Sequence, residues 1–246
     1  MFDFEVKIAQ SQEEIKKAQR LRYEIFRLEM GAGALSTVDE PVDKDIHDKY
    51  CEHLIVIDKT VDKVVGTYRF LLGSRVEKKI GFYSEKFFNI SNIKKLDNDF
   101  QVMELGRSCI HRDYRSHPVI NLLWNGIARY IKDYNVRYLF GVARLLSNDP
   151  LEVSRVFRFL RKRFYAGPRL RVYPKPKSKF HGLKRNIKLE NPREIIRLLP
   201  PLVKGYLRAG VLVCGLPAVD TDLDSVVVFI LLDVENLTRS YKEHFL

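Results

Sequence analysis

The stretch from residue 102 to residue 134 constrains the fold more than any other part of this sequence. VMELGRSCI (102–110) is rich in apolar residues over nine positions, which predicts a strand. PVINLLWNGIARYIKDY (118–134) has apolar residues at helical spacing, and its proline suits the first turn of a helix that Ser116 or His117 would cap. A strand that passes through a basic turn into a helix is typical of α/β proteins.

The remaining segments extend this pattern. Ser11 and Glu14 form a capping box, which predicts a helix that runs to Gly31. A loop is expected up to Asp48, and irregular structure over 73–100. We expect further strands at 53–58, 63–72 and 136–145 and within VLVCGLP and SVVVFILLDV, and helices at 149–163 and, with a proline pair in its middle, 191–210. The sequence therefore predicts one α/β domain over residues 1–246 with a mixed sheet.

The composition indicates in which cellular compartment the protein is found. The chain has 246 residues and 46% hydrophobic content, enough for a sizeable core. Its longest apolar run, VVVFILL (226–232), is far short of the roughly 20 residues that span a bilayer. MFDFEVKIAQ has neither a basic nor an apolar region of a secretory signal. Three cysteines without a CxxC pair argue against a disulfide framework. A cytoplasmic protein is the expectation.

The net charge of +12 is concentrated in one segment. Residues 155–188 contain 13 Lys or Arg and no Asp or Glu, whereas the rest of the chain has 30 basic and 31 acidic residues. Such a patch predicts an acidic partner, namely nucleic acid, an anionic membrane or an acidic carrier protein. A solvated linker is the alternative. Interleaved aromatic residues suit binding of single-stranded nucleic acid, but that function leaves the acid within strand 102–110 unexplained.

Glu104 is the unusual residue of that strand. Strand alternation places it on the face opposite Arg107 and Cys109, unless Gly106 allows a bulge that turns Arg107 toward Glu104 and exposes a backbone N–H. A buried carboxylate is costly unless it is paired or reached by water. Two interpretations follow: an ion pair with a buried arginine such as Arg22 or Arg69, or a general base with a raised pKa.

The turn after the strand favours binding of an anion. Free N–H groups and the helix dipole attract negative charge at a helix N-terminus. No glycine-rich cradle for a di- or triphosphate is present, so a single phosphate fits best. The candidate residues are Arg112, Arg115, Ser116 and His117.

Five segments in order resemble a known family. They are RLRYEIFRLEMGA (20–32), DKYCEHLIVID (48–58), VVGTYRFL (64–71), ELGRSCIHRDYR (104–115) and LPPLVKGYLRAGVLVCGLPAVD (199–220). The chain resembles the acyl-carrier-protein-dependent GNAT acyltransferases, and within them the ornithine N-acyltransferases. The resemblance implies a mixed, mostly antiparallel central sheet flanked by helices, with residues 191–246 completing or extending the domain.

The resemblance also implies a reaction. A (3-hydroxy) fatty acyl group would move from the phosphopantetheine thioester of acyl carrier protein to the α-amino group of an amino acid, above all L-ornithine, giving lyso-ornithine lipid. The implied catalytic residues are Glu104 as base with Arg107, Arg22, Asp48 and Arg69. Acyl-homoserine-lactone synthases share a sparser form of this pattern, with Asp45 or Asp48 in the loop. Their tryptophan after the first helix is missing here, since the only tryptophan is Trp124, which disfavours lactone formation.

The implied carrier protein is acidic and would dock on the basic segment, at Arg155, Arg158, Arg161, Lys162 and Arg163. No tightly bound cofactor, metal site or nucleic acid is expected. Coenzyme A thioesters remain an alternative donor, and lysine, glycine, glutamine or an aromatic amino acid an alternative acceptor.

Three further features have two interpretations each. Cys109 is a core residue or a nucleophile. Asp220 and Asp222 lie in a solvated loop or meet a cationic substrate. The apolar side of helix 191–210 packs on the sheet or gives a peripheral membrane contact.

Overall fold

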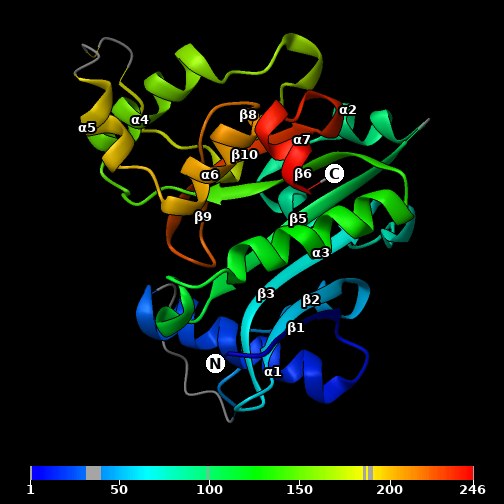
Figure 1. Ribbon diagram of the computed structural model, residues 1–246. Helices are drawn as coiled ribbons and strands as arrows, with labels where there is room; N and C mark the ends of the chain where they lie inside the picture. The colour runs from blue at the N-terminus through cyan, green and yellow to red at the C-terminus, as the bar shows by residue number, and fades with distance from the viewer. Residues whose placement is uncertain (1, 32–39, 99, 185–186, 188–190, 246) are drawn as a thin grey trace. The chain divides into compact units, whose positions relative to one another are not determined.

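The computed structural model describes residues 2–31, 40–98, 100–184, 187 and 191–245. It divides into two compact units (Figure 1). The first unit comprises the residues up to Gly81 together with Met103–Val136, and the second comprises Phe82–Val102 and Arg137–His244. Within the described residues, no helix is long and apolar enough to cross a membrane. The chain leaves and re-enters each unit, so neither unit is one continuous segment.

The first unit is built on four antiparallel strands in the order β1-β2-β3-β5. β2, β3 and β5 confirm the strands expected at 53–58, 63–72 and 102–110, whereas β1 was not predicted. Their bounds are β1 (Phe4–Ile8), β2 (Glu52–Asp58), β3 (Lys63–Leu72) and β5 (Gln101–Ile110).

Two helices of the first unit cover opposite faces of these strands. α1 (Gln12–Tyr23) continues as a π-helical segment to Glu29, close to the end expected at Gly31, and α3 (Val119–Asp133) is the helix expected after the basic turn. In β2, Ile55 packs with α1, and its neighbour Leu54 lies against α3 at Gly126. Neighbouring residues of a strand point to opposite faces, so α1 and α3 lie on different sides.

The contact between α3 and the strands depends on two glycines, Gly66 of β3 and Gly126 of α3, at which there is no room for a Cβ atom. A Cβ atom on Gly66 of β3 would lie 2.6 Å from Val119 Cγ1, and one on Gly126 of α3 would lie 2.7 Å from Leu54 Cδ1. Figure 1 shows α3 (green) running across the strands of this unit. The N-cap of α3 is Pro118 without a side-chain hydrogen bond. The expected cap by Ser116 or His117 is therefore wrong, because the helix begins after the proline.

The second unit is built around β10, which pairs antiparallel with β6, β8 and β9. The single helix expected over 191–210 is instead two helices, α5 and α6, because Pro200 and Pro201 interrupt it. The bounds are β6 (Val136–Arg144), α4 (Pro150–Arg163), α5 (Pro192–Arg197), α6 (Pro201–Ala209), β8 (Leu212–Val213), β9 (Ala218–Asp220), β10 (Ser225–Asp233) and α7 (Arg239–Phe245).

The core of the second unit takes the apolar sides of α4, α5 and α6. Phe157 and Leu160 of α4, Ile195 of α5 and Val203 of α6 are buried together with Val228 of β10. This packing accounts for the apolar side of segment 191–210 by contact with the sheet, the first of its two interpretations.

A small substructure of the second unit occupies the stretch expected to be irregular. Here β4 (Phe88–Asn89) pairs antiparallel with β7 (Tyr173–Pro174), and the short helix α2 (Ser91–Lys94) follows β4. β7 belongs to the basic segment 155–188, so that segment contributes both to α4 and to this small sheet.

Candidate active site

A buried arginine of α1 is the centre of the charged cluster in the first unit. Arg22 is fully buried, and its Nε donates to Asp43 Oδ2 at 3.0 Å. Its Nη1 and Nη2 donate to Asp48 Oδ1 and Oδ2 at 2.5 and 3.2 Å. A planar guanidinium matches a carboxylate with two parallel hydrogen bonds in this way. Arg22 therefore fixes both ends of the loop that carries the two aspartates.

Asp45, between those two aspartates in sequence, binds two more arginines. Arg69 Nη1 of β3 donates to Asp45 Oδ1 at 2.7 Å, and Arg107 Nη2 of β5 donates to Oδ2 at 3.2 Å. Arg107 Nε also lies 3.1 Å from Asp43 Oδ2. Three arginines and three aspartates thus form one network, which we call the Arg–Asp network: Arg22, Arg69, Arg107, Asp43, Asp45 and Asp48.

The network lowers the pKa of two of its aspartates, Asp45 and Asp48. Burial alone would raise the pKa of Asp45, but a hydrogen bond from His47 and the charges of Arg69 and Arg107 outweigh it and hold that pKa well below its usual range. For Asp48, burial is likewise outweighed, here by Arg22 and Arg69, and the pKa is lowered. The buried charges are compensated, as burial of ions requires.

Backbone hydrogen bonds hold the loop in place around these charges. Asp48 Oδ2 accepts from the Asp45 backbone N–H at 2.7 Å, and the Asp43 N–H donates to the Gln19 carbonyl of α1 at 3.0 Å. His53 of β2 lies with Nε2 3.0 Å from the Asp48 carbonyl oxygen. Burial lowers the pKa of His53, which favours a neutral ring that donates to this carbonyl. The loop is therefore tied to both α1 and β2.

Strand β5 has an irregularity next to the glycine that suggested one. Gly106 pairs with Arg69 and Cys109 with Thr67, so Arg107 and Ser108 together oppose a single residue of β3. Arg107 has φ +49°, a left-handed conformation. This β-bulge lets Arg107 share Asp45 with Arg69. It also places Cys109 on the face that packs with α1, so simple alternation across the bulge was wrong.

Glu104 lies on the same face as the Arg–Asp network. It pairs with Leu71 in the register of β3 and β5, two residues from Arg69 along the strand. Directly opposed residues share a face, and residues offset by two are diagonal neighbours. The Glu104 residue is 6% exposed. Its charge also acts on the half-buried thiol of Cys51 at the start of β2.

The five catalytic candidates expected from the sequence therefore lie in one region of the first unit. They are Arg22, Asp48, Arg69, Glu104 and Arg107. Asp43 and His53 were missed, and Asp45 was named only as an alternative to Asp48. The acids of VDKDIHD (42–48) carried a signal, since three carboxylates in seven residues must find cations if the loop is buried.

The four residues of the basic turn do not form a closed cradle. Arg115 is engaged with Glu29, at 2.6 and 2.7 Å from its two oxygens, and this hydrogen bond lowers the pKa of Glu29. Arg112 and Ser116 are exposed, and the His117 ring lies 4.4 Å from the Phe2 ring. A phosphate site here stays a prediction.

The basic residues of α4 face outward in the second unit. Arg158, Arg161, Lys162 and Arg163 are exposed, and Arg155 is half-buried. Arg161 and Arg163 lie over the rings of Tyr165 and Phe159 at 5.7 and 5.1 Å. The guanidinium groups themselves lie over the two rings, and both arginines remain exposed.

The cysteines are thiols in this structure. Burial raises the pKa of Cys51, Cys109 and Cys214 to about 12 each. A thiol, unlike a thiolate, is a weak nucleophile, which favours the core interpretation of Cys109. Over the described ranges, no group of His, Cys, Asp and Glu side chains has an arrangement that holds a metal ion.

The fold and the sequence now define a class. Residues 21–125 match the acetyltransferase (GNAT) domain. FeeM, an N-acyl amino acid synthase from uncultured soil microbes, has a similar fold, with a TM-score of 0.58 and 9% identity over 99% of both chains. The CoA-dependent acyl-homoserine lactone synthase BjaI gives a TM-score of 0.53 and 13% identity over 99% of this chain and 90% of that one. The protein is an acyltransferase of the GNAT class.

Within that class, the chain belongs to the L-ornithine N(alpha)-acyltransferase family. It is 31% identical to the L-ornithine N(alpha)-acyltransferase of Brucella abortus (strain 2308), over 98% of this chain and 88% of that protein. The resemblance stated from five sequence segments is thereby confirmed, and the chain is an N-acyltransferase.

Proposed function

We propose that this protein transfers a long-chain acyl group from the thioester of acyl carrier protein to the α-amino group of L-ornithine, giving lyso-ornithine lipid. The observation that carries the proposal is the buried Glu104 on the same sheet face as the Arg–Asp network. The family supports an amino acid as acceptor, and the likeness to the L-ornithine N(alpha)-acyltransferase of Brucella abortus supports ornithine.

Glu104 is the proposed general base. An amino acid at neutral pH carries an ammonium group, which must lose a proton before it attacks. Glu104 takes this proton, directly or through a water molecule, and the free amine attacks the thioester carbonyl carbon. A C–N bond forms and the C–S bond breaks. The attacking nitrogen loses a second proton as the amide forms, so one of the two protons passes to the departing thiolate and the other to solvent water. The charge on the carbonyl oxygen is stabilised by a backbone N–H near the bulge of β5.

The arginines of the network have unequal roles in this proposal. Arg22 is fully buried and its hydrogen bonds go to Asp43 and Asp48, so it acts as a positioning residue for the loop. Arg107, whose side chain is 8% exposed against 1% for Arg22, is the better candidate to meet the carboxylate of the substrate. Arg69 shares Asp45 with Arg107 and holds it in place.

The donor is assigned from charge. Acyl carrier proteins are acidic, and the exposed basic residues of α4 offer a complementary surface. The thioester arm carries one phosphate, for which Arg112, Arg115, Ser116 and His117 are the proposed ligands. Binding there requires Arg115 to exchange its bonds with Glu29 for bonds with the phosphate.

The test is a turnover assay with a matched variant. The purified protein is incubated with 3-hydroxypalmitoyl carrier protein and the twenty amino acids plus ornithine, and the products are identified by mass spectrometry. We expect acyl-ornithine, and a fall in kcat of about 10²- to 10⁴-fold in Glu104→Gln. Glu5→Gln replaces an exposed strand glutamate and should leave the rate unchanged.

Three outcomes distinguish the parts of this proposal. Acylation of lysine, glycine or glutamine in place of ornithine would correct the acceptor and keep the mechanism. Equal rates with the coenzyme A thioester would correct the donor. Full activity of Glu104→Gln would exclude Glu104 as the base.

A further inference from the structure

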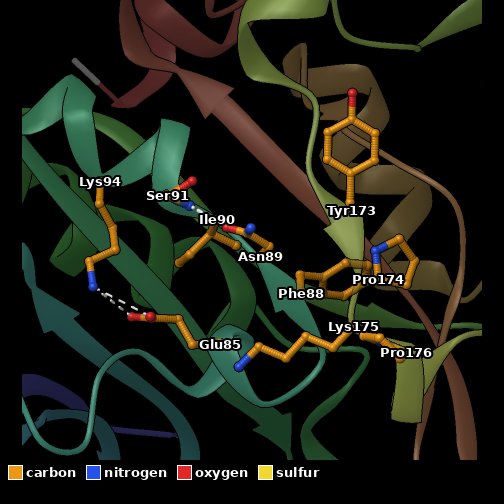
Figure 2. A pocket seen from close by; sticks show the side chains of 10 residues that line it. All are labelled: Glu85, Phe88, Asn89, Ile90, Ser91, Lys94, Tyr173, Pro174, Lys175 and Pro176. Atoms are coloured by element: carbon orange, nitrogen blue, oxygen red, sulfur yellow. Dashed lines mark hydrogen bonds and ion pairs between the residues drawn. The ribbon is translucent and has the colours of Figure 1, made fainter.

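The second unit contains a pocket that the proposed reaction does not use. It has a volume of about 470 Å³ and lies at the small sheet formed by β4 and β7, next to α2 (Figure 2). This volume is within the range of roughly 300–1,000 Å³ typical of small-molecule sites. None of its residues belongs to the Arg–Asp network. The lining residues are Glu85, Phe88, Asn89, Ile90, Ser91, Lys94, Tyr173, Pro174, Lys175 and Pro176.

Part of the lining is apolar. Phe88 and Ile90 lie beneath it but are only 0% and 1% exposed, so its accessible apolar surface comes from Tyr173 and Pro174 of β7 and from Pro176 in the turn that follows. Tyr173 is 68% exposed. In Figure 2, its ring stands on the other side of the pocket from Lys94 and Glu85. Such a surface can take an alkyl chain.

The polar part of the lining carries one uncompensated charge. Glu85 lies with its two carboxylate oxygens 3.2 and 3.3 Å from Lys94 Nζ, and Oε1 also accepts from the Phe82 backbone N–H. Lys175 has no side-chain hydrogen bond or ion pair with any residue in the described part of the chain. In Figure 2 its side chain extends toward Glu85. Two lysines and one glutamate give the lining a formal charge of +1.

We propose that this pocket binds a single alkyl chain that ends in a carboxylate. The carboxylate pairs with Lys175, and the chain lies on Tyr173 and the two prolines. A fatty acid and an N-acyl amino acid both have this chemistry. Binding of an N-acyl amino acid rests on the function proposed above, because it is the product of that reaction. Binding of a fatty acid does not rest on that function.

Calorimetric titration of the whole protein tests the charge requirement. The probes are decanoate, decanol and decyltrimethylammonium, each below the concentration at which it aggregates. We expect saturable binding of one decanoate per chain and at least tenfold weaker binding of the other two. Equal affinity for the three probes would overturn the proposal, because the apolar surface alone would then explain the binding.

Two variants of equal charge test the location. Lys175→Gln should weaken decanoate binding about tenfold, equivalent to about 1.4 kcal/mol. Lys177→Gln removes the same charge from the adjacent turn, at a residue outside the pocket lining, and should change the affinity less than twofold. Equal losses in both variants would show attraction to the basic segment in general and refute the pocket. Both lysines are exposed, so neither change should affect folding.

A fourth probe, N-decanoyl-ornithine, distinguishes the two possible ligands, a fatty acid and an N-acyl amino acid. Tighter binding than decanoate, lost in Glu85→Gln, indicates that the pocket accepts the acylated amino acid, with its ammonium group at Glu85. Equal binding of both probes assigns the pocket to fatty acids. These titrations contain no acyl donor. A lack of binding in them would therefore refute the pocket and would not bear on the proposed acyl transfer, which the turnover assay tests.

Discussion

Arg22 shows what a single residue contributes to this fold. Its guanidinium is out of contact with water and binds two carboxylates. A fully buried charge is tolerated only with such partners, and removal of one partner leaves the others uncompensated. The residue that orders the loop is therefore also one on which the stability of the first unit depends.

We expect Arg22→Ala to lower the free energy of unfolding by about 3–5 kcal/mol, because Asp43 and Asp48 remain buried without their cation. Arg20→Ala is the control, since that side chain is 48% exposed and lies 3.5 Å from Glu13. It should cost less than about 1 kcal/mol. Urea unfolding of both variants measures the difference, and a small loss in Arg22→Ala would contradict the role assigned to the network.

The same network predicts how stability changes with pH. The pKa values of Asp45 and Asp48 are lower in the folded protein than in the unfolded chain. Their contribution is complete above the unfolded pKa, near 4, and is lost as the pH falls below it toward the folded values. The free energy of unfolding should thus fall between pH 5 and pH 3 in urea titrations.

Asp45→Asn separates this contribution from that of other acids. The variant should be less stable at pH 6, and its stability should fall less between pH 5 and pH 3 than that of the unchanged protein, because one lowered pKa is missing. An unchanged slope would mean that Asp45 does not contribute to acid unfolding.

Some residues of the site could be predicted from the sequence and others could not. Glu104 stood out because a carboxylate in an apolar strand requires an explanation, and Arg22 because it lies on the apolar stripe of its helix. The position of Asp43 and the contact of His53 with the Asp48 carbonyl could not be predicted, since both depend on how the loop before β2 folds back onto α1. Local patterns contain no information on such a contact.

At the scale of elements, the docking surface proposed for α4 gives a test that separates binding of the donor from the chemical step. Arg161→Glu with Lys162→Glu should raise KM for acyl carrier protein tenfold or more and leave KM for a simple pantetheine thioester unchanged, because only the protein donor contacts α4. Arg239→Glu on α7, a side chain that is 92% exposed, is the control. Steady-state kinetics with both donors decides, and parallel changes in both KM values would exclude docking on α4.

The packing of α3 on the strands gives a matched pair of glycine substitutions. Gly66→Ala places a Cβ 2.6 Å from Val119 Cγ1, a branched side chain that cannot turn away, and should cost about 1–3 kcal/mol. Gly205→Ala lies within α6 with no atom within 4 Å of the new Cβ. It should stabilise by about 0.5–1 kcal/mol. Thermal unfolding measures both, and destabilisation by Gly205→Ala would show that the helix has less room than described.

Elements with strong periodicity or caps were predicted closely, as α4 illustrates: Asp149 caps it and Pro150 begins it. β1, β4, β7 and β9 were not predicted. Each is five residues or shorter, and such strands exist because a partner strand completes their hydrogen bonds, not because of their own propensity. The bulge of β5 was expected at Gly106 and lies one residue later, at Arg107 and Ser108. A glycine permits an irregularity, but the pairing of β5 with β3 determines its position.

At the scale of the whole molecule, the family match and the charge distribution describe different properties. Matches over nearly the whole chain place it among N-acyltransferases, whereas the concentration of basic residues in 155–188 concerns a partner. The structure distributes that basic segment over α4 and the β4–β7 pocket. One run of the sequence therefore supplies two surfaces, each with its own test.

The balance of charge in the Arg–Asp network has a consequence for ionic strength. Three guanidinium groups and three carboxylates cancel, and the cluster is largely buried, so dissolved ions change its energy little. The exposed charges of α4 are screened over a Debye length of about 8 Å at 0.15 M salt. If the donor is an acidic carrier protein, as proposed, added salt should weaken its encounter with α4 and leave the Arg–Asp network almost unaffected. The dependence of the rate on salt then shows whether the encounter or the chemical step is rate-limiting.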